Sequence, residues 1–301
     1  MDVQHIAAFA MDGTGGNPAG VVLLDALPEA AAMQAVAADV GYSETVFAAP
    51  VPGGWRVRYF APAMEVPFCG HATIALGAAL ARQAGEGVHR LLLNEAEITV
   101  EGRREGGQFV ATLVSPPTWH EAAPTALMEK ALALFGYAPE ELDPRVPHAL
   151  IGAGARHLLL ALSSRERLAA MAYDIAAGAA LMRDAGLVTI MLVQAESRQR
   201  FHARNAFAAG GVAEDPATGA AAAAFAGYLR ALGWPHGGGI EILQGQDMGM
   251  PSLLRAEITP GAGSGIRVSG AARLSADPLP LPRWRPAHGA GTAVAENQPS
   301  S

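Results

Sequence analysis

Two stretches of the sequence decide its fold: Tyr59-Phe-Ala-Pro-Ala-Met-Glu-Val-Pro-Phe-Cys-Gly-His-Ala-Thr73 and Phe207-Ala-Ala-Gly-Gly-Val-Ala-Glu-Asp-Pro-Ala-Thr-Gly-Ala220. In each stretch a strand-like run ends in Phe-Ala, a turn-rich segment with an acidic residue follows, and a helix begins at small residues. Because the same order of events occurs twice, the sequence predicts a duplicated fold. A site between the two halves is the economical consequence.

Strand-like and helix-like runs alternate on both sides of these stretches. Helices are expected at residues 29–40, 72–83, 124–135, 165–172, 175–184 and 217–232. Strands are expected at residues 3–10, 20–24, 45–49, 55–60, 90–93, 98–101, 108–114, 157–161, 187–193, 201–207, 240–243, 253–258 and 266–268. Both halves of the chain are therefore expected to mix strands with helices.

A double proline in Ser115-Pro-Pro117 marks the predicted domain boundary. It divides the chain into an N-terminal domain, residues 1–117, and a C-terminal domain, residues 118–285. The last stretch, residues 286–301, is polar, aperiodic and rich in Gly, Ala and Pro. It is expected to be a disordered tail.

Composition argues against several classes of protein. The formal net charge of −7, without a Lys/Arg-rich run, argues against nucleic acid or an anionic membrane as the partner. Without a secretory or membrane-spanning stretch, the chain is expected to be cytoplasmic. The single cysteine, Cys69, excludes an intrachain disulfide and a two-thiol redox pair. The single lysine, Lys130, lies in an amphipathic helix, which argues against Schiff-base chemistry.

Histidine spacing gives no indication of a metal site. The nine histidines are scattered, and none forms a closely spaced ligand pair or a His-Glu-x-x-His motif. No Walker loop and no Gly-x-Ser-x-Gly elbow is present. No metal is therefore expected.

The two predicted helix starts offer backbone N–H groups to a ligand. The first N–H groups of a helix have no partner within the helix, and the peptide dipoles add partial positive charge there. Two such ends in one cleft would hold a carboxylate without a lysine or a metal. The alternative is ordinary capping, in which the small residues serve helix packing. The residues expected to bind substrate are Gly70, Ala72, Thr73, Thr218, Gly219 and Ala220.

Three side chains are candidates for proton transfer. Glu44 follows a helix-ending glycine at the start of an apolar strand, where partial removal from water would raise its pKa toward neutrality. A solvent-facing turn residue is the alternative for Glu44. Asp215 would either bind a substrate amine or hydroxyl or cap the following helix. His71 would act as a donor, a proton relay or a cap, and Cys69 beside it is expected to be a small buried apolar residue.

Five motifs, in order along nearly the whole chain apart from the tail, resemble one known family. They are Gly16-Asn-Pro-Ala-Gly-Val-Val22, Tyr42-Ser-Glu-Thr-Val-Phe47, Glu65-Val-Pro-Phe-Cys-Gly-His-Ala-Thr73, Glu214-Asp-Pro-Ala-Thr-Gly219 and Gln244-Gly-Gln-Asp-Met-Gly249. The chain resembles the phenazine-biosynthesis PhzF-like proteins. The resemblance implies an α+β fold like that of diaminopimelate epimerase. Two similar domains would each wrap a curved, barrel-like, mostly antiparallel sheet around a central helix, with a cleft between them.

The resemblance also implies a cofactor-independent isomerase that acts on a small acidic substrate. The best-known member of the family isomerises trans-2,3-dihydro-3-hydroxyanthranilate. The proton-shuttling glutamate of the family corresponds to Glu44, while His71 and Asp215 correspond to residues that position substrate and assist transfer. Asn17, in the first motif, is expected to bind substrate. The family further implies a homodimer.

Two residues depart from the family pattern. Ala220 stands where the family commonly has serine, and Met250 stands where an arginine is often found. Two alternatives therefore stay open. One is a racemase or epimerase of a small amino or hydroxy acid, which would pair Glu44 with Cys69 or Asp215. The other is a non-catalytic ligand-binding protein, in which Ala220 marks lost chemistry.

Overall fold

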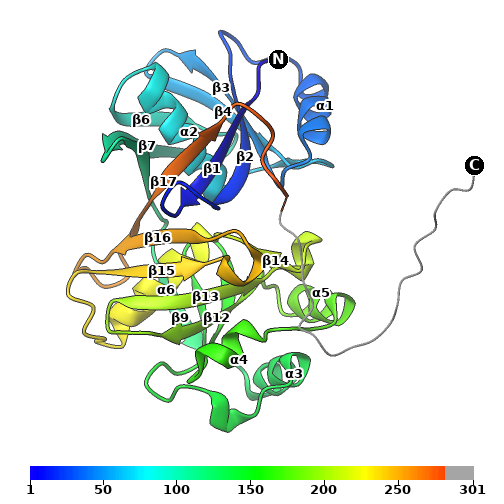
Figure 1. The fold of residues 1–301 in the computed structure, drawn as a ribbon, viewed down its shortest axis with the longest axis vertical. Coiled ribbons are helices and arrows are strands. Elements are labelled where there is room, and N and C mark those ends of the chain that lie inside the picture. The colour runs from blue at the N-terminus through cyan, green and yellow to red at the C-terminus, as the bar shows by residue number, and fades with distance from the viewer. Residues whose placement is uncertain (282–301) are drawn as a thin grey trace, which may run out of the picture.

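The structure is a computed structural model that describes residues 1–281. Its two halves are stacked along the long axis, the first half at the top of the view and the second half below it (Figure 1). The predicted tail, residues 286–301, lies outside the described residues. Among residues 1–281, the longest apolar helices are still too short or too polar to cross a membrane.

The fold is α+β and dominated by one 17-stranded sheet. The α-helices are α1 (Ala30–Val40), α2 (Gly70–Gln83), α3 (Thr125–Phe135), α4 (Arg165–Ala169), α5 (Ile175–Asp184) and α6 (Gly219–Ala231). The strands of the N-terminal part are β1 (Gln4–Ala10), β2 (Asn17–Leu23), β3 (Thr45–Val51), β4 (Gly54–Phe60), β5 (Glu65–Val66), β6 (Gly87–Leu92), β7 (Glu97–Glu105) and β8 (Gln108–Val114). The others are β9 (Trp119–Ala122), β10 (Ala149–Gly152), β11 (Arg156–Ala161), β12 (Thr189–Ala195), β13 (Arg200–Ala206), β14 (Glu214–Asp215), β15 (Gly239–Gln244), β16 (Ser252–Glu257) and β17 (Arg267–Ser275).

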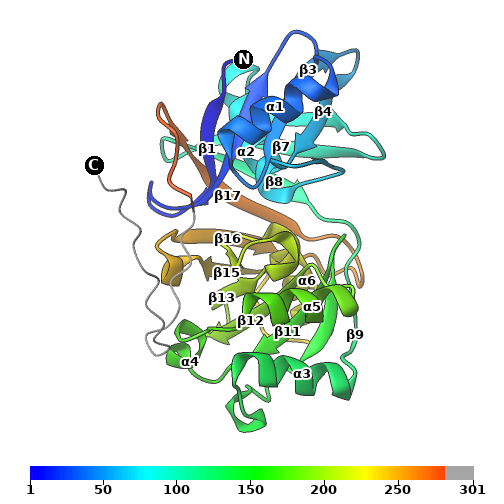
Figure 2. The ribbon, with the colours of Figure 1, turned by 90° about the vertical axis from the view of Figure 1, so that its right-hand side faces the viewer.

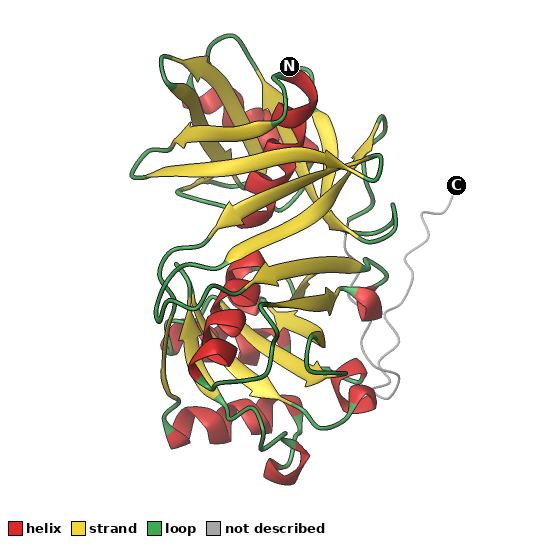
Figure 3. Ribbon diagram, turned by 90° about the vertical axis from the view of Figure 1, so that its left-hand side faces the viewer, coloured by secondary structure: helices red, strands yellow, loops and turns green. Residues whose placement is uncertain are grey.

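In the first half, the strand pairings return to their starting strand. β1 pairs with β2, β2 with β3, β3 with β4, β4 with β6, β6 with β7, and β7 with β8. β17 pairs with both β8 and β1 and completes this circuit. The α2 helix contacts strands around the circuit and is buried from His71 to Ala81. It is the central helix of this half, enclosed by strands (Figure 3).

Small residues let these strands approach α2 closely. A Cβ atom added at Gly77 would lie 2.6 Å from Val100 Cγ2 and 2.9 Å from Ala111 Cβ. One added at Gly102 would lie 2.3 Å from the carbonyl oxygen of Gly77. The alanine- and glycine-rich sequence of α2 therefore allows the strands to pack closely against it.

The second half covers both faces of its strands with helices (Figure 2). Successive side chains of a strand point to opposite faces. On β11, Leu159 and Ala161 belong to the core shared with α6, while Leu158 and Leu160 belong to a second core shared with α3, α4 and α5. The α6 helix is buried from Ala221 to Leu229 and is the central helix of this half.

The β17 strand joins the two halves. The sequence predicted a strand only at residues 266–268, but β17 extends to Ser275 and pairs with β1 and β8 as well as with β16. The predicted length was wrong because the pairing partners are far away in the sequence. Part of residues 118–285 thus lies in the sheet of the first half, while the boundary at residue 117 stays a prediction.

Candidate active site

The starts of the central helices α2 and α6 meet at one pocket. Gly70 and Ile74 of α2 and Gly219 and Ala220 of α6 line it. The other lining residues come from both halves: Phe9, Phe68, Leu113, Ser115, Pro116, Ala153 and Val268. None of these lining residues is charged, and most of them are apolar.

Phe9 owes its position in the pocket to an unusual backbone. Its φ is 61°, at a register shift between Ala8 and Ala10 where β1 pairs with β17. A left-handed φ is strained for a bulky residue. Gly270 makes room for it, because a Cβ atom there would lie 2.4 Å from Phe9 Cδ1. Phe9 was not among the predicted site residues, since no sequence pattern indicates this irregularity.

Glu44, His71 and Cys69 form a contact group beside the pocket. Glu44 immediately precedes β3, and its side chain is 18% exposed. The Glu44 Oε2 lies 3.5 Å from Nε2 of His71, the residue after Gly70. The Cys69 Sγ lies 3.3 Å from the other ring nitrogen, His71 Nδ1. Ser43 Oγ is 3.4 Å from His71 Nε2. The imidazole of His71 therefore contacts both the carboxylate and the thiol, and the thiol also hydrogen-bonds Glu44.

Asp215 is held by donors from both halves of the molecule. Asn17, the first residue of β2, donates from Nδ2 to Asp215 Oδ1 over 2.7 Å and to the Ala217 carbonyl over 3.1 Å. Thr218 donates from its hydroxyl to Asp215 Oδ2 over 2.6 Å. Both carboxyl oxygens thus accept a hydrogen bond, and one of these bonds crosses between the halves.

The surroundings raise the pKa of two groups. Removal from water raises the pKa of Asp215 to about 6; the nearby His71 and the Thr218 hydrogen bond oppose this rise, and the charge of Glu44 adds to it. Burial raises the pKa of the Cys69 thiol well above its usual range, and Glu44 adds to this effect. Cys69 is therefore a protonated thiol at neutral pH, as expected of a buried small residue.

Several hydrogen-bond donors of the predicted substrate-binding residues are already bonded within the protein. Thr73 has none, because its hydroxyl donates to the Cys69 carbonyl over 2.7 Å and its N–H bonds the same oxygen over 3.0 Å. Ala72 directs its N–H to the Cys69 thiol, and the Asn17 amide donates to Asp215 and Ala217. Gly70, Gly219 and Ala220 line the pocket.

Thr218 and Gln244 belong together in the structure. The Thr218 hydroxyl bonds Asp215, and the Thr218 N–H donates to Gln244 Oε1 over 3.3 Å. Gln244 was not among the predicted site residues. Two features of the sequence could have indicated it. Gln244 opens the fifth motif, and it follows Ile240 and Ile242 in alternation, so it faces the same buried side of β15.

One group of side chains has the residue types of a metal site. Glu44, Cys69 and His71 each offer one ligand atom within 4.8 Å of the others. The Cys69 thiol of this group is buried and protonated, and it also hydrogen-bonds the Glu44 carboxyl group, so the three side chains contact one another directly. We assign no metal to this group.

The fold brings acid–base side chains from both halves to the starts of two helices. Carboxyl, imidazole and thiol groups lie at these two helix starts. Side chains of these types can act in general acid–base catalysis. The chain belongs to the phenazine biosynthesis-like protein family, PhzC-PhzF, whose family model matches residues 6–277. The family predicted from the five motifs is confirmed.

Similar proteins agree with this assignment. A trans-2,3-dihydro-3-hydroxyanthranilate isomerase of Pseudomonas fluorescens is 34% identical over 84% of this chain and 88% of its own. An uncharacterized isomerase of Mesorhizobium japonicum is 32% identical over 89% of this chain and 95% of its own. The crystal structure of a PhzF-family phenazine biosynthesis protein of Bacillus anthracis has a TM-score of 0.80 at 21% identity, and covers 90% of this chain and 96% of its own. The relatives confirm the prediction of an enzyme of the isomerase class.

Proposed function

We propose that this chain is a cofactor-independent isomerase in which Glu44 moves a proton on a small carboxylate-bearing substrate. The observation that carries the proposal is the placement of two carboxyl groups, Glu44 from the first half and Asp215 from the second, at the two converging helix starts. The charges of Glu44 and His71 both act on the pKa of Asp215, so the three groups share one electrostatic environment.

The substrate carboxylate is held at the starts of α2 and α6. Their first N–H groups have no partner within the helix, and their dipoles favour an anion. Gly70 leaves space for it, since a Cβ atom there would meet nothing within 4 Å, whereas a Cβ atom at Gly219 would lie 3.5 Å from Phe9 Cζ. Asp215 accepts a hydrogen bond from a substrate amine or hydroxyl on the side of the second half.

Glu44 then carries the reaction. As a carboxylate it removes a proton from a saturated carbon of the substrate, and the electrons of that C–H bond move into the conjugated system. The same carboxyl group returns the proton to a second carbon, so one C–H bond breaks and one forms. His71, 3.5 Å from Glu44, steadies the carboxyl group. The reaction needs no oxidant, reductant or further reactant.

We further propose that each half is a curved, barrel-like sheet around its central helix. The returning pairings of the first half support this arrangement. The homodimer and the cytoplasmic location stay predictions. Size-exclusion chromatography with light scattering would test the homodimer directly.

Deuterium uptake tests the role of Glu44. The protein is incubated with trans-2,3-dihydro-3-hydroxyanthranilate in D2O, and deuterium at the ring carbons is followed by NMR. We expect uptake by the wild type and a loss of about 10²–10⁴-fold in Glu44→Gln, because a positioned acid–base group contributes that much. Glu129→Gln, exposed on α3, is the matched control.

Each outcome has a definite meaning. Uptake by Glu44→Gln at the wild-type rate would contradict the role of Glu44. No uptake by the wild type would reject this substrate, although it would not touch the family assignment. Ala220, on the pocket wall, would then be the first departure from the family pattern to suspect.

One observation favours a second candidate, a racemase or epimerase of a small amino or hydroxy acid. Asp215, with a pKa of about 6, can exchange a proton near neutral pH from the half opposite Glu44. Such an enzyme would exchange the α-hydrogen of its substrate with D2O and change the optical rotation of the mixture. Saturable binding without any exchange would instead favour the non-catalytic alternative.

A further inference from the structure

Gln244 lies directly behind Asp215 and Thr218. Its side chain is almost fully buried, with 1% exposed. The amide nitrogen Nε2 donates to the Asp215 carbonyl over 2.7 Å and to Thr218 Oγ1 over 3.1 Å. The amide oxygen Oε1 accepts the N–H of Thr218 over 3.3 Å. One side chain therefore holds the backbone on both sides of Pro216-Ala217.

These bonds have a fixed direction. The Thr218 hydroxyl has one hydrogen, which it donates to Asp215 Oδ2. The Thr218 oxygen therefore accepts its second hydrogen bond from the Gln244 Nε2 donor. The hydrogen bonds run in one direction, from the Gln244 amide through the Thr218 hydroxyl to the Asp215 carboxylate. The amide of Gln244 offers one donor group and one acceptor at its end, whereas an ionised glutamate would offer two acceptors.

We propose that Gln244 is a positioning residue that sets the Asp215 carboxylate and the first turn of α6 for substrate binding. The proposal rests on the proposed function, in which Asp215 and the start of α6 hold the substrate. Gln244 touches no reacting atom, and it acts through Thr218 and through the backbone of residues 215–218. Its loss would therefore weaken substrate binding more than it slows proton transfer by Glu44.

Close packing behind Asp215 supports this role. A Cβ atom added at Gly245 would lie 2.2 Å from the Met250 carbonyl oxygen and 2.8 Å from the Pro216 carbonyl oxygen. Gly245 also has a φ of 74°, which favours glycine. The turn after Gln244 is thus pressed against the Asp215-Pro216 segment, and the segment has little room to relax if Gln244 is altered.

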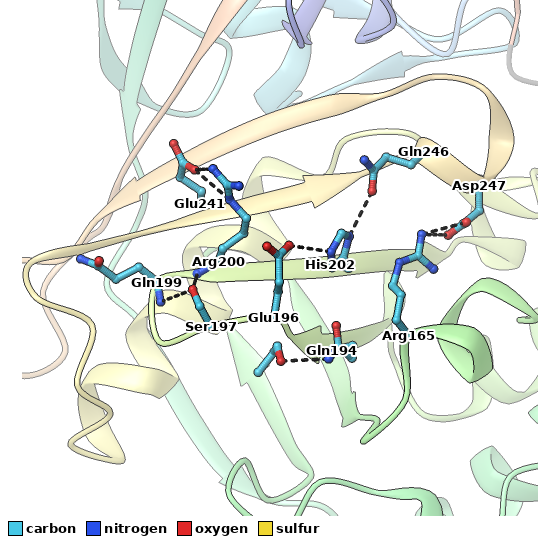
Figure 4. Close-up of polar contacts among 11 residues, drawn as sticks. Arg165, Gln194, Glu196, Ser197, Gln199, Arg200, His202, Glu241, Gln246 and Asp247 are labelled. Carbon is cyan, nitrogen blue, oxygen red and sulfur yellow. Dashed lines mark hydrogen bonds and ion pairs between the residues drawn. The ribbon is translucent and has the colours of Figure 1, made fainter.

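Gln246, two residues further on, provides a matched control. It lies on the other side of the turn, where Oε1 is 3.1 Å from Nδ1 of His202 (Figure 4). His202 also contacts Glu196, over 2.9 Å. Since Phe201 and Ala203 belong to the core, His202 faces the opposite side of β13, away from α6. Gln246 has the chemistry of Gln244 without its contacts to the site.

The kinetic test compares Gln244→Glu with Gln246→Glu in the full chain, with trans-2,3-dihydro-3-hydroxyanthranilate as the probe. We expect KM to rise at least tenfold in Gln244→Glu, because hydrogen bonds that serve a charged group are lost, and kcat to change less. Gln246→Glu should leave both constants within twofold of the wild type. Gln244→Met, which lacks any hydrogen bond, carries the same expectation if Gln244→Glu does not fold.

A second readout does not depend on turnover. The Asp215 carboxyl carbon is followed by NMR through a pH titration after ¹³C-aspartate labelling, and its signal is assigned by its loss in Asp215→Asn. The midpoint should move to higher pH in Gln244→Glu, because the new carboxylate repels the Asp215 charge and the donor to Thr218 is lost. It should not move in Gln246→Glu.

The two readouts separate the proposals. A wild type without turnover would reject this probe as the substrate of the proposed function, while the titration would still decide the role of Gln244. An unmoved Asp215 midpoint in Gln244→Glu, together with a KM within twofold of the wild type where turnover is measurable, would overturn the positioning role.

Discussion

The carboxyl group of Asp215 has a pKa of about 6, against 3.8 for an ordinary aspartate. The folded protein therefore binds this proton more tightly than the unfolded chain does. A group of this kind stabilises the fold fully below the unfolded pKa, and that contribution is lost as the pH rises through the folded pKa. Above pH 6 the ionised Asp215 opposes folding, which is common where a carboxylate serves a site instead of the fold.

Replacing Asp215 with asparagine removes this opposition. We expect Asp215→Asn to raise the free energy of unfolding at pH 8 by about 2 kcal/mol relative to the wild type, allowing for the partial exposure of the group. Near pH 4 the gain should largely disappear, because the wild-type carboxyl is then protonated. Urea unfolding at both pH values measures the difference, with exposed Asp184→Asn as the control. Equal gains at the two pH values would speak against the raised pKa.

The sequence singled out residues that a motif surrounds, and their roles stay predictions. Glu44, His71 and Asp215 each stand in an unusual local pattern, and the structure brings them to the same two helix starts. The sequence could not show which donors are already used, because those bonds depend on the folded backbone. Thr73 illustrates this, since its hydroxyl and its N–H both bond the Cys69 carbonyl. Gln244 is a second example, because α6 separates it in the sequence from its partners Asp215 and Thr218.

At the scale of elements, the close packing of strands on α2 can be tested at Gly77. Gly77→Ala would stabilise an exposed helix by up to about 1 kcal/mol. Here we expect the opposite sign, a loss of about 1–3 kcal/mol, because the new methyl group would overlap Val100 and Ala111. Thermal and urea unfolding would measure it. A Gly77→Ala protein as stable as the wild type would show that the strands yield easily. The double variant Gly77→Ala with Val100→Ala should lose less stability than the sum of the two single variants.

The helices were predicted to within a few residues, but several strands were missed. The helix patterns carry their own signals, such as Gly41 with a left-handed φ of 69° at the end of α1. The missed strands β5, β9, β10 and β14 have two to four residues each. Strands this short are defined by their partners and not by their own sequence. The same reason explains why β17 was predicted too short. Small residues such as Gly270 allow contact with Phe9, but they do not indicate a strand.

At the scale of the whole molecule, β17 makes the first half dependent on the end of the described chain. A fragment of residues 1–117 would leave β1 and β8 with unpaired edges. We expect this fragment not to unfold cooperatively in urea, as followed by circular dichroism. His5 pairs with Ser275, so β17 ends beside the start of β1. Residues 265–281 joined by a short linker ahead of residue 1 should restore cooperative unfolding to the fragment.

The outcome that counts against this dependence is a fragment of residues 1–117 that folds cooperatively without β17. A matched control carries the same added segment with proline in place of Ala271 and Leu274. Proline removes backbone donors from the strand, and it should prevent the rescue.

The position of β17 also determines when, during translation, the first half can complete its sheet. Translation proceeds from the N-terminus, so β8 emerges from the ribosome early and β17 emerges only after the intervening 115–266 segment. At ~5–20 residues per second, the first half waits about 8–30 s for its missing strand. During that interval the part of the protein that is synthesised first lacks one strand of its sheet, and it gains that strand only when the end of the described chain has been made.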